Sequence, residues 1–277
     1  MQNAGIESLR LNWRYLAFDV QPGDLRSAIA GAKAMRFVGL NLTVPHKLLA
    51  LDIMEALDES AVAWQAVNTV RFETRDRAGH WVPLAKVPSG EIVEVRAHGF
   101  NTDAEAVARS LREDLGLDLK GIAVLLLGAG GAGRVAALKL AAEGVEALFL
   151  VNRTPSKAER LGAELGDRFP RVAVTVGYPT RGVELVLNAT SLGLKPDDPL
   201  PLDPARFSLG KARAVYDMVY RPAETRLLRT AKAAGCQTAN GLGMLLFQGA
   251  RALELWSGRK APIEAMRRAL AKDVYGH

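Results

Sequence analysis

Apolar runs of strand length alternate with amphipathic segments along most of this chain of 277 residues. The amphipathic segments repeat their apolar residues at spacings of three and four, which is typical of helices, whereas the runs are short enough for buried strands. In the first hundred residues the pattern predicts strands over 15–20, 37–42 and 66–72 and helices over 22–34 and 45–57. Such alternation of strand and helix favours an α/β fold.

The alternation continues through the second half of the chain. The pattern there predicts strands over 122–127, 147–151, 171–176, 184–188 and 213–217, and helices over 104–115, 132–143, 155–165, 223–234, 241–257 and 261–272. A charged stretch that contains proline, residues 73–98, interrupts the pattern between the two halves. We interpret it as a long surface hairpin with short alternating runs at 80–84 and 91–95.

A glycine-rich segment directly follows the strand run 122–127. Gly128, Gly130 and Gly133 fit the pattern G-x-G-x-x-G between a predicted strand and a predicted helix. In that context the first glycine permits a tight turn, the second lets the backbone approach a pyrophosphate, and the third lets helix and strand pack closely. The alternative is a glycine-rich turn without a ligand. The expected cofactor contacts in this loop are Gly128, Ala129, Gly130, Gly131, Ala132 and Gly133.

The residues after the next strand indicate which dinucleotide is bound. An acidic residue at this point would accept the ribose 2′-hydroxyl of NAD, but the chain reads Asn152-Arg153-Thr154, with Lys157 about one helical turn further on. An arginine fork suits a 2′-phosphate, so we predict NADP(H) as the cofactor.

Further along, Asn188-Ala189-Thr190-Ser191 follows a strand. This segment is either a loop at the nicotinamide side of the cofactor site or a simple polar turn.

These motifs predict two α/β domains. We expect an N-terminal substrate-binding and catalytic domain over 1–103 and a Rossmann-type NADP-binding domain over 104–240. The boundary lies near Asn101-Thr102-Asp103, where Thr102 or Asp103 suits the start of a helix. The last helices, over 241–277, are expected to pack back toward the substrate domain.

Composition excludes several other classes of protein. No apolar segment approaches the ~18 residues of a membrane span, and the chain shows no secretory signal. Its one cysteine, Cys236, cannot form a disulfide within the chain or a multi-cysteine metal site, which favours the cytoplasm. The net charge of +6 comes from scattered basic residues, so we expect a small anionic ligand rather than nucleic acid. We also expect no metal ion, and a monomer or homodimer.

Lys47 lies in the first turn of a predicted helix, where a cation opposes the helix dipole, and this placement hints at a functional role. An ordinary exposed lysine is the alternative.

Seven motifs, taken in their order along the chain, resemble the shikimate dehydrogenase family. They are residues 41–47 (NLTVPHK), 66–70 (AVNTV), 99–103 (GFNTD), the glycine loop with Asn152-Arg153-Thr154, residues 188–191 (NATS), residues 217–220 (DMVY) and residues 241–245 (GLGML) leading to Gln248.

The resemblance implies a reversible reduction of 3-dehydroshikimate to shikimate with NADPH, as in chorismate biosynthesis. It assigns Lys47 and Asp103 to the catalytic pair, with the lysine as proton donor and acceptor and the aspartate orienting it. His46, beside that lysine, is interpreted as a structural residue. The resemblance also implies substrate contacts by Thr43, Asn68, Asp103, Tyr220 and Gln248, and nicotinamide contacts by Met218 and Gly241.

The chain departs from the family pattern at its start and in the length of the segment between Asn68 and Asp103. The family opens with a central strand and a Ser-x-Ser turn that binds the substrate carboxylate, whereas this chain begins inside the following helix. We therefore expect an incomplete first sheet and either a mis-assigned start or a weak enzyme. A quinate or shikimate dehydrogenase using NAD, and a non-catalytic dinucleotide-binding relative, are the alternative functions.

Overall fold

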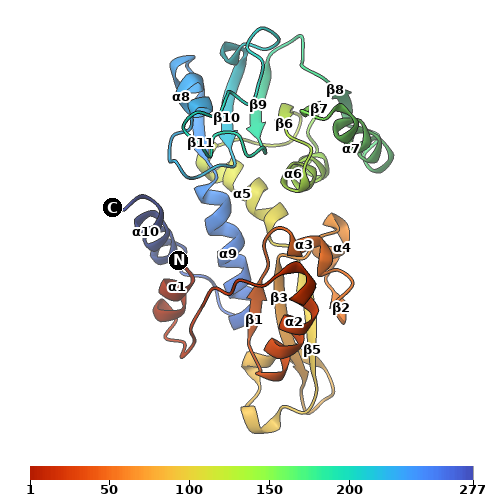
Figure 1. Cartoon of the computed structure of the whole chain (residues 1–277), viewed down its shortest axis with the longest axis vertical. Coiled ribbons are helices and arrows are strands. Elements are labelled where there is room, and N and C mark those ends of the chain that lie inside the picture. The colour runs from red at the N-terminus through yellow and green to blue at the C-terminus, as the bar shows by residue number, and fades with distance from the viewer. Residues whose placement is uncertain (277) are drawn as a thin grey trace. The chain divides into compact units, whose positions relative to one another are not determined.

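The computed structural model describes residues 1–276, which form two compact units (Figure 1). The first unit contains Met1–Asp103 and Leu246–Asp273, and the second contains Ala104–Leu245 and Val274–Gly276. Two helices contribute to both units, namely α9 (Leu242–Ser257) and α10 (Ile263–Tyr275). No helix in the described part of the chain is both long and apolar enough to cross a membrane.

The first unit is built on a mixed sheet of five strands in the order β1-β3-β5-β2, with β4 paired to β3. All the pairings are antiparallel except that of β2 with β5. Helices α2 and α4 pack on β5, and apolar residues such as Val70 and Phe72 of β3 form the core beneath them. The elements are α1 (Gln2–Ser8), α2 (Leu25–Ala34), β1 (Gly39–Asn41), α3 (His46–Leu49), β2 (Ala56–Leu57), α4 (Glu59–Trp64), β3 (Thr69–Arg75), β4 (Trp81–Pro83) and β5 (Val95–Phe100), with short 3-10 turns at Pro22–Asp24, Leu84–Lys86 and Ser89–Glu91.

The strand predicted over 15–20 is wrong, because this segment has no strand beside it and makes no ladder. A strand needs a neighbour to satisfy its backbone groups. The alternating side chains that suggested the strand, Leu16 and Phe18, are 66% and 62% exposed. One edge of this sheet is β1, which lies within the predicted strand 37–42 and pairs with β3 on one side only.

The helix predicted over 45–57 is also shorter than expected. It ends at Leu49, and turns then lead into β2. Glu55 explains the change of structure, because its carboxylate accepts from the backbone N–H of Ala97 and so ties this segment to β5. The 73–98 segment does form an excursion from β3 through β4, and Leu84 within it is buried in the core of the first unit. β5 itself was not predicted.

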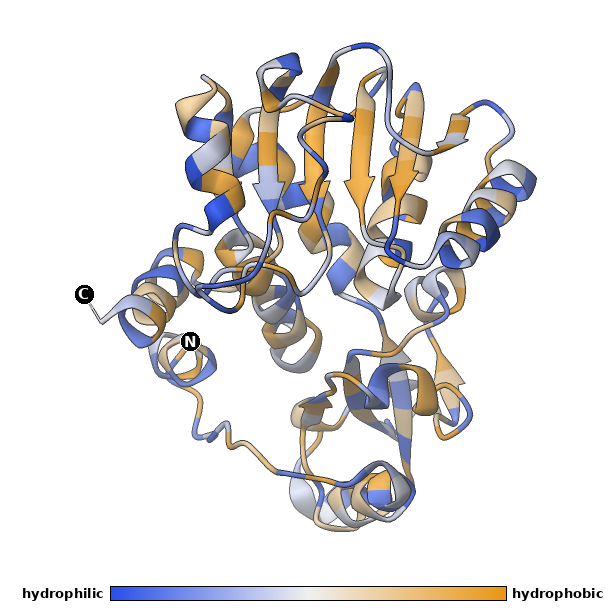
Figure 2. Cartoon of the chain, turned by 45° about the horizontal axis from the view of Figure 1, so that its top comes forward, coloured by the Kyte–Doolittle hydropathy of each residue, from blue (hydrophilic) through white to orange (hydrophobic). Residues whose placement is uncertain are grey.

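The second unit has a parallel sheet of six strands in the order β11-β10-β9-β6-β7-β8. The inner strands are almost entirely apolar, as Figure 2 shows, because both of their faces are buried. Helix α6 packs on β6, α7 on β7 and β8, and α8 on β10 and β11. The elements are α5 (Asp103–Leu115), β6 (Ala123–Leu127), α6 (Gly131–Ala142), β7 (Ala147–Val151), α7 (Pro155–Arg168), β8 (Ala173–Val176), β9 (Val183–Asn188), a 3-10 turn (Leu209–Lys211), β10 (Ala212–Asp217), α8 (Arg226–Ala233) and β11 (Gln237–Asn240).

The predicted α/β fold is confirmed, and in the second unit every predicted strand and helix is present within a few residues of its expected ends. The second unit also contains one strand that was not predicted, β11. Its four residues are mostly polar, and it lies at the edge of the sheet beside β10. An edge strand exposes one side to solvent, so it lacks the continuous apolar run that identified the inner strands.

A buried carboxylate stabilises the polar face of the first sheet. Glu73 is 1% exposed and accepts from Arg71 Nε at 2.9 Å, Arg96 Nε at 2.8 Å and the ring of His98 at 3.1 Å. Burial alone would raise the pKa of Glu73, but hydrogen bonds from His98, Arg71 and Arg96 outweigh burial and lower this pKa to about 2. The contribution of Glu73 to folding is therefore fully present above about pH 4.5 and is lost as the pH falls through about 2.

Glu73→Gln is expected to lower the free energy of unfolding of the first unit by about 3 kcal/mol at neutral pH, because it removes a buried carboxylate and leaves two half-buried guanidinium groups without their partner. The variant should also lack the part of the acid-induced stability loss that Glu73 contributes. Chemical unfolding followed from pH 7 to pH 2 checks both. Glu94→Gln, in an exposed pair with Arg75, is the matched control and should stay near the parent. Equal stability of the Glu73 and Glu94 variants would contradict the assignment.

Candidate active site

The lysine and the aspartate predicted as the catalytic pair lie in contact within the first unit. Lys47 is the second residue of α3 and Asp103 is the first of α5, and Lys47 Nζ donates to Asp103 Oδ2 at 2.7 Å. Their side chains are 28% and 11% exposed, so a ligand can reach both from solvent. The backbone fixes Lys47 as well, since its carbonyl accepts from Val67 N at 2.9 Å.

Asn68 lies immediately before β3, and its buried amide is held by Thr102, the residue before Asp103. Asn68 Oδ1 accepts from the backbone N–H of Thr102 at 2.8 Å and from Thr69 Oγ1 at 3.1 Å, while Asn68 Nδ2 donates to Thr102 Oγ1 at 3.0 Å. Because Thr102 immediately precedes Asp103, one short segment positions both the amide and the carboxylate. The structure thus brings together the predicted residues Lys47, Asn68 and Asp103.

Two neighbours of this group were not predicted as site residues. Asn41 donates from Nδ2 to Thr69 Oγ1 at 3.1 Å, and Tyr15 donates from its hydroxyl to Asn41 Oδ1 at 3.1 Å. Burial raises the pKa of Tyr15, which keeps the phenol protonated as a donor. Asn41 was visible in the NLTVPHK motif, but Tyr15 belonged to a segment predicted as a strand, and nothing in that pattern pointed to the site.

Thr43, Gln248 and His46 also lie in the first unit. Thr43 is exposed on the turn before α3, its carbonyl accepts from His46 N at 2.8 Å, and within the described residues its hydroxyl forms no hydrogen bond. Gln248 is half-buried on α9. The ring of His46 lies 2.9 Å from the carbonyl oxygen of Val20, a contact that favours a structural role for this histidine.

The glycine loop of the second unit connects β6 to α6. Gly128 has a φ of +106°, which favours glycine, and a Cβ on Gly133 would lie 2.0 Å from the carbonyl oxygen of Gly128. Side chains at Gly130 and Gly131 would meet nothing within 4 Å, so the space over the start of α6 is open. Open space beside the N–H groups of a helix N-terminus fits a dinucleotide pyrophosphate.

The segment after β7 carries the predicted 2′-phosphate contacts. Asn152 ties it to the glycine loop, because Asn152 Oδ1 accepts from Ala129 N at 3.0 Å and Asn152 Nδ2 donates to the carbonyl of Thr154 at 2.9 Å. Arg153 and Lys157 are exposed, and among residues 1–276 neither forms an ion pair. Both cations are therefore available to an anion at this end of the loop.

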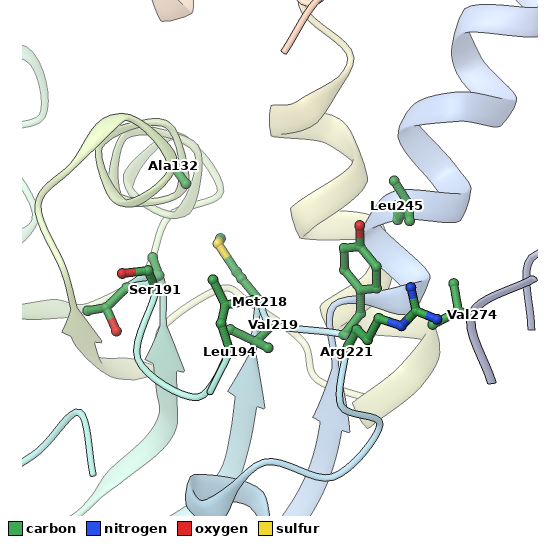
Figure 3. Close-up of a pocket in the computed structure, with 11 residues that line it drawn as sticks. Ala132, Ser191, Leu194, Met218, Val219, Arg221, Leu245 and Val274 are labelled. Atoms are coloured by element: carbon green, nitrogen blue, oxygen red, sulfur yellow. The ribbon is translucent and has the colours of Figure 1, made fainter. Parts of the chain in front are cut away.

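A cavity of about 630 Å³ lies in the second unit beside the glycine loop (Figure 3). The predicted nicotinamide contacts Met218 and Gly241 are neighbours, since a Cβ on Gly241 would lie 2.1 Å from the carbonyl oxygen of Met218. Tyr220, predicted as a substrate contact, lines this cavity. The cavity is lined by Ala132, Ala189, Thr190, Ser191, Leu194, Met218, Val219, Tyr220, Arg221, Leu245 and Val274.

Asp217, at the end of β10, holds the two loops that line the cavity. Its buried carboxylate accepts from Asn188 Nδ2 at 2.8 Å, from Val219 N at 3.0 Å and from Thr225 Oγ1 at 2.6 Å. Burial raises the pKa of Asp217, and the hydrogen bonds from Thr225, Val219 and Asn188 oppose that rise. The sequence placed Asp217 in a motif but gave it no role, because its donors come from two separate segments, one of them 29 residues away.

Metal ligands do not gather in the part of the chain that the structure describes: residues 1–276 contain no group of three or more histidine, cysteine, aspartate or glutamate side chains that could hold a metal ion.

A parallel sheet with a glycine loop before α6, cations after β7 and a cavity beside them defines a dinucleotide-binding unit. Together with the Lys47–Asp103 pair, it places the protein among the nicotinamide-dependent oxidoreductases. Three family models match the chain: the shikimate dehydrogenase substrate binding domain at residues 1–70, shikimate / quinate 5-dehydrogenase at 109–175, and the shikimate 5′-dehydrogenase C-terminal domain at 241–271. The chain belongs to the shikimate dehydrogenase family, and the resemblance found in its motifs is confirmed.

Individual relatives agree with this assignment. The chain is 39% identical to shikimate dehydrogenase (NADP(+)) of Methanopyrus kandleri, with 99% of this chain and 90% of the relative covered. A solved structure of shikimate 5-dehydrogenase from Thermus thermophilus, in complex with NADP(H) and shikimate, is 35% identical to this chain and has a TM-score of 0.79. The match covers 98% of this chain and 92% of the Thermus chain. A quinate dehydrogenase from Corynebacterium glutamicum in complex with NAD is 27% identical, with a TM-score of 0.79 and coverage of 98% and 92%.

Proposed function

We propose that this protein catalyses the reversible, NADPH-dependent reduction of 3-dehydroshikimate to shikimate. The observation that carries the proposal is the 2.7 Å contact between Lys47 and Asp103 beside the locked amide of Asn68. These side chains offer a proton donor, a carboxylate and a hydrogen-bond donor to a polyhydroxylated ring. The family membership of the chain supports the same reaction.

Lys47 is the proposed acid and base of the reaction. NADPH supplies a hydride to the carbonyl carbon of the substrate. The C=O bond becomes a C–O single bond, and the Lys47 ammonium gives its proton to that oxygen, leaving a neutral amine that regains a proton from solvent. In the oxidative direction the neutral amine accepts the hydroxyl proton. Asp103 keeps Nζ pointed at the reacting oxygen and accepts a hydrogen bond from a ring hydroxyl.

The remaining substrate contacts are proposals of the same kind. Thr43 and Gln248 are proposed to complete the substrate pocket, and Tyr220, which lines the cavity of the second unit, is proposed to contact the substrate. We also propose that the protein works in the cytoplasm on a small-molecule substrate, as a monomer or homodimer, in the biosynthesis of chorismate and the aromatic amino acids.

NADP specificity is proposed to depend on Arg153, with Thr154 and Lys157 as further contacts. Arg153→Ala is expected to raise KM for NADPH about tenfold, because an exposed hydrogen-bonded contact to a charged group contributes about 1.5 kcal/mol. KM for NADH, which lacks the 2′-phosphate, should stay within about twofold of the parent, and initial-rate kinetics with both cofactors would check this. Arg160→Ala, an exposed arginine within α7 and beyond the proposed contacts, is the control. Equal effects on the two cofactors would contradict the role of Arg153.

The competing activity is oxidation of quinate with NAD. We consider it because one of the similar solved structures is a quinate dehydrogenase in complex with NAD. Rates measured with 3-dehydroshikimate plus NADPH and with quinate plus NAD, on the same preparation, distinguish the two. We expect turnover of the first pair to exceed that of the second. Turnover of the second pair alone would overturn the proposal, and binding of NADPH without turnover of either would favour a non-catalytic dinucleotide-binding protein.

A further inference from the structure

The loop between β10 and α8, residues 218–225, forms one wall of the cavity in the second unit. Four consecutive residues of this loop, Met218 to Arg221, line the cavity. Figure 3 shows Arg221 beside Val274, on the side away from Ala132 and Ser191. Val274 belongs to the last turn of α10, so a segment far away in the sequence completes this wall.

The residue after Val274 is tied directly to the loop. The Tyr275 hydroxyl donates to the carbonyl oxygen of Tyr220 at 2.9 Å and accepts from Asn240 Nδ2 at 2.8 Å. The second N–H of the Asn240 amide donates to the carbonyl of Ala223 at 2.8 Å, and its oxygen accepts from Leu242 N at 3.0 Å. Two carbonyl groups in the middle of the loop are thus held by one phenol and one amide.

The two ends of the loop are fixed by a different group. Asp217 accepts from Val219 N and from Thr225 Oγ1, so this carboxylate holds the second and the last residue of the loop without help from Tyr275. The stretch from Tyr220 to Ala223 has no bond to Asp217 and depends on Tyr275 and Asn240 instead. Removing the Tyr275 hydroxyl should therefore loosen the cavity wall while the ends of the loop stay in place.

We infer that Tyr275 is a positioning residue for the nicotinamide end of the cofactor site, acting through the carbonyl of Tyr220. The inference rests on the proposed function in one respect, which is that the nicotinamide is taken to bind in this cavity. Burial raises the pKa of Tyr275, while the hydrogen bond from Asn240 opposes that rise, and a protonated phenol is what donation to a carbonyl requires. Neither Tyr275 nor Asn240 stood out in the sequence.

Tyr275→Phe tests the inference, because it keeps the ring and deletes only the hydroxyl. We expect it to weaken NADPH affinity and raise KM for NADPH about three- to tenfold, the range for one net hydrogen bond, with KM for shikimate changed less than about twofold. Tyr178→Phe is the matched control, since its hydroxyl also accepts a hydrogen bond, from Asp203 N at 2.8 Å, and Tyr178 does not line the cavity. This control should leave KM for NADPH unchanged.

Asn240→Ala extends the test, because it removes two hydrogen bonds at once, the one to the carbonyl of Ala223 and the one to the Tyr275 hydroxyl. Its effect on NADPH affinity should be at least as large as that of Tyr275→Phe, and the double variant should fall short of the product of the two effects, since the residues share one bond. NADPH affinity is read from nucleotide fluorescence without substrate, so the comparison stands even if 3-dehydroshikimate proves not to be the substrate. Unchanged affinity in Tyr275→Phe, an equal effect in Tyr178→Phe, or a loss of thermal stability alone would overturn the inference, as would failure of the parent protein to bind NADPH.

Discussion

Lys47→Ala is expected to lower kcat for shikimate oxidation by about 10²- to 10⁴-fold, the usual contribution of a positioned acid or base. The amine proposed to exchange the proton is lost, and the Asp103 carboxylate is left without its partner at 2.7 Å. NADPH affinity should hold within about twofold, because the glycine loop and the cations after β7 belong to the second unit. Steady-state kinetics in both directions, with NADPH titration by fluorescence, measure the two quantities separately.

The control for this prediction is Lys33→Ala. Lys33 also pairs with a carboxylate in the first unit, that of Glu55, but it lies on α2 and outside the proposed site. The control should keep kcat within about twofold, since partly exposed ion pairs contribute little. If Lys47→Ala retained turnover within a few-fold of the parent, another group would have to carry the proton.

Gly133→Ala is expected to lower kcat/KM for NADPH by about a hundredfold, because a displacement near 1 Å in a reacting assembly has an effect of that size. The new Cβ would lie 2.0 Å from the carbonyl oxygen of Gly128, and backbone cannot yield to it as a flexible side chain could. Either α6 or the turn at Gly128 must shift, and the N–H groups that face the pyrophosphate shift with it. NADPH titration and initial rates would measure the loss.

Gly166→Ala separates this local clash from a general effect of adding a methyl group. Gly166 lies within α7, and a Cβ there meets nothing within 4 Å. Alanine is favoured over glycine in a helix interior by about 1 kcal/mol, so this control should be as stable as the parent or more so, with unchanged cofactor kinetics. Normal NADPH kinetics in Gly133→Ala would show that the loop does not hold the dinucleotide as proposed.

Much of the second unit could be predicted from the sequence because each of its signals is local. The glycine loop is a continuous segment whose spacing follows from one turn and one helix start, and the buried strands are continuous apolar runs. Asp217 and Tyr275 could not be assigned in this way. Their partners lie up to 55 residues away, and nothing in the local pattern says which of many polar residues will meet.

Less of the first unit could be predicted from the sequence. Residues 15–20 have the alternation of a strand, yet a strand forms only beside another strand, and the pattern within one segment cannot supply that neighbour. β5 was overlooked because its six residues include arginine, histidine and glycine, which are polar or flexible rather than apolar. Its stability comes from pairing with β3 and from the Glu73 network, and both depend on residues brought together only by folding.

The locked amide of Asn68 has a consequence for stereochemistry. Its oxygen already accepts two hydrogen bonds, from Thr102 N and Thr69 Oγ1, so only an N–H remains to face a ligand. A ring oxygen that meets this N–H must accept, and its own proton then has to point elsewhere, with the Asp103 carboxylate as the nearby acceptor. The direction of this hydrogen bond to the ring is thereby set before binding. An epimer at that ring carbon would carry its hydroxyl away and leave the Asn68 N–H and the carboxylate without partners, which gives the proposed site a means of rejecting epimers through unpaired polar groups as well as by shape.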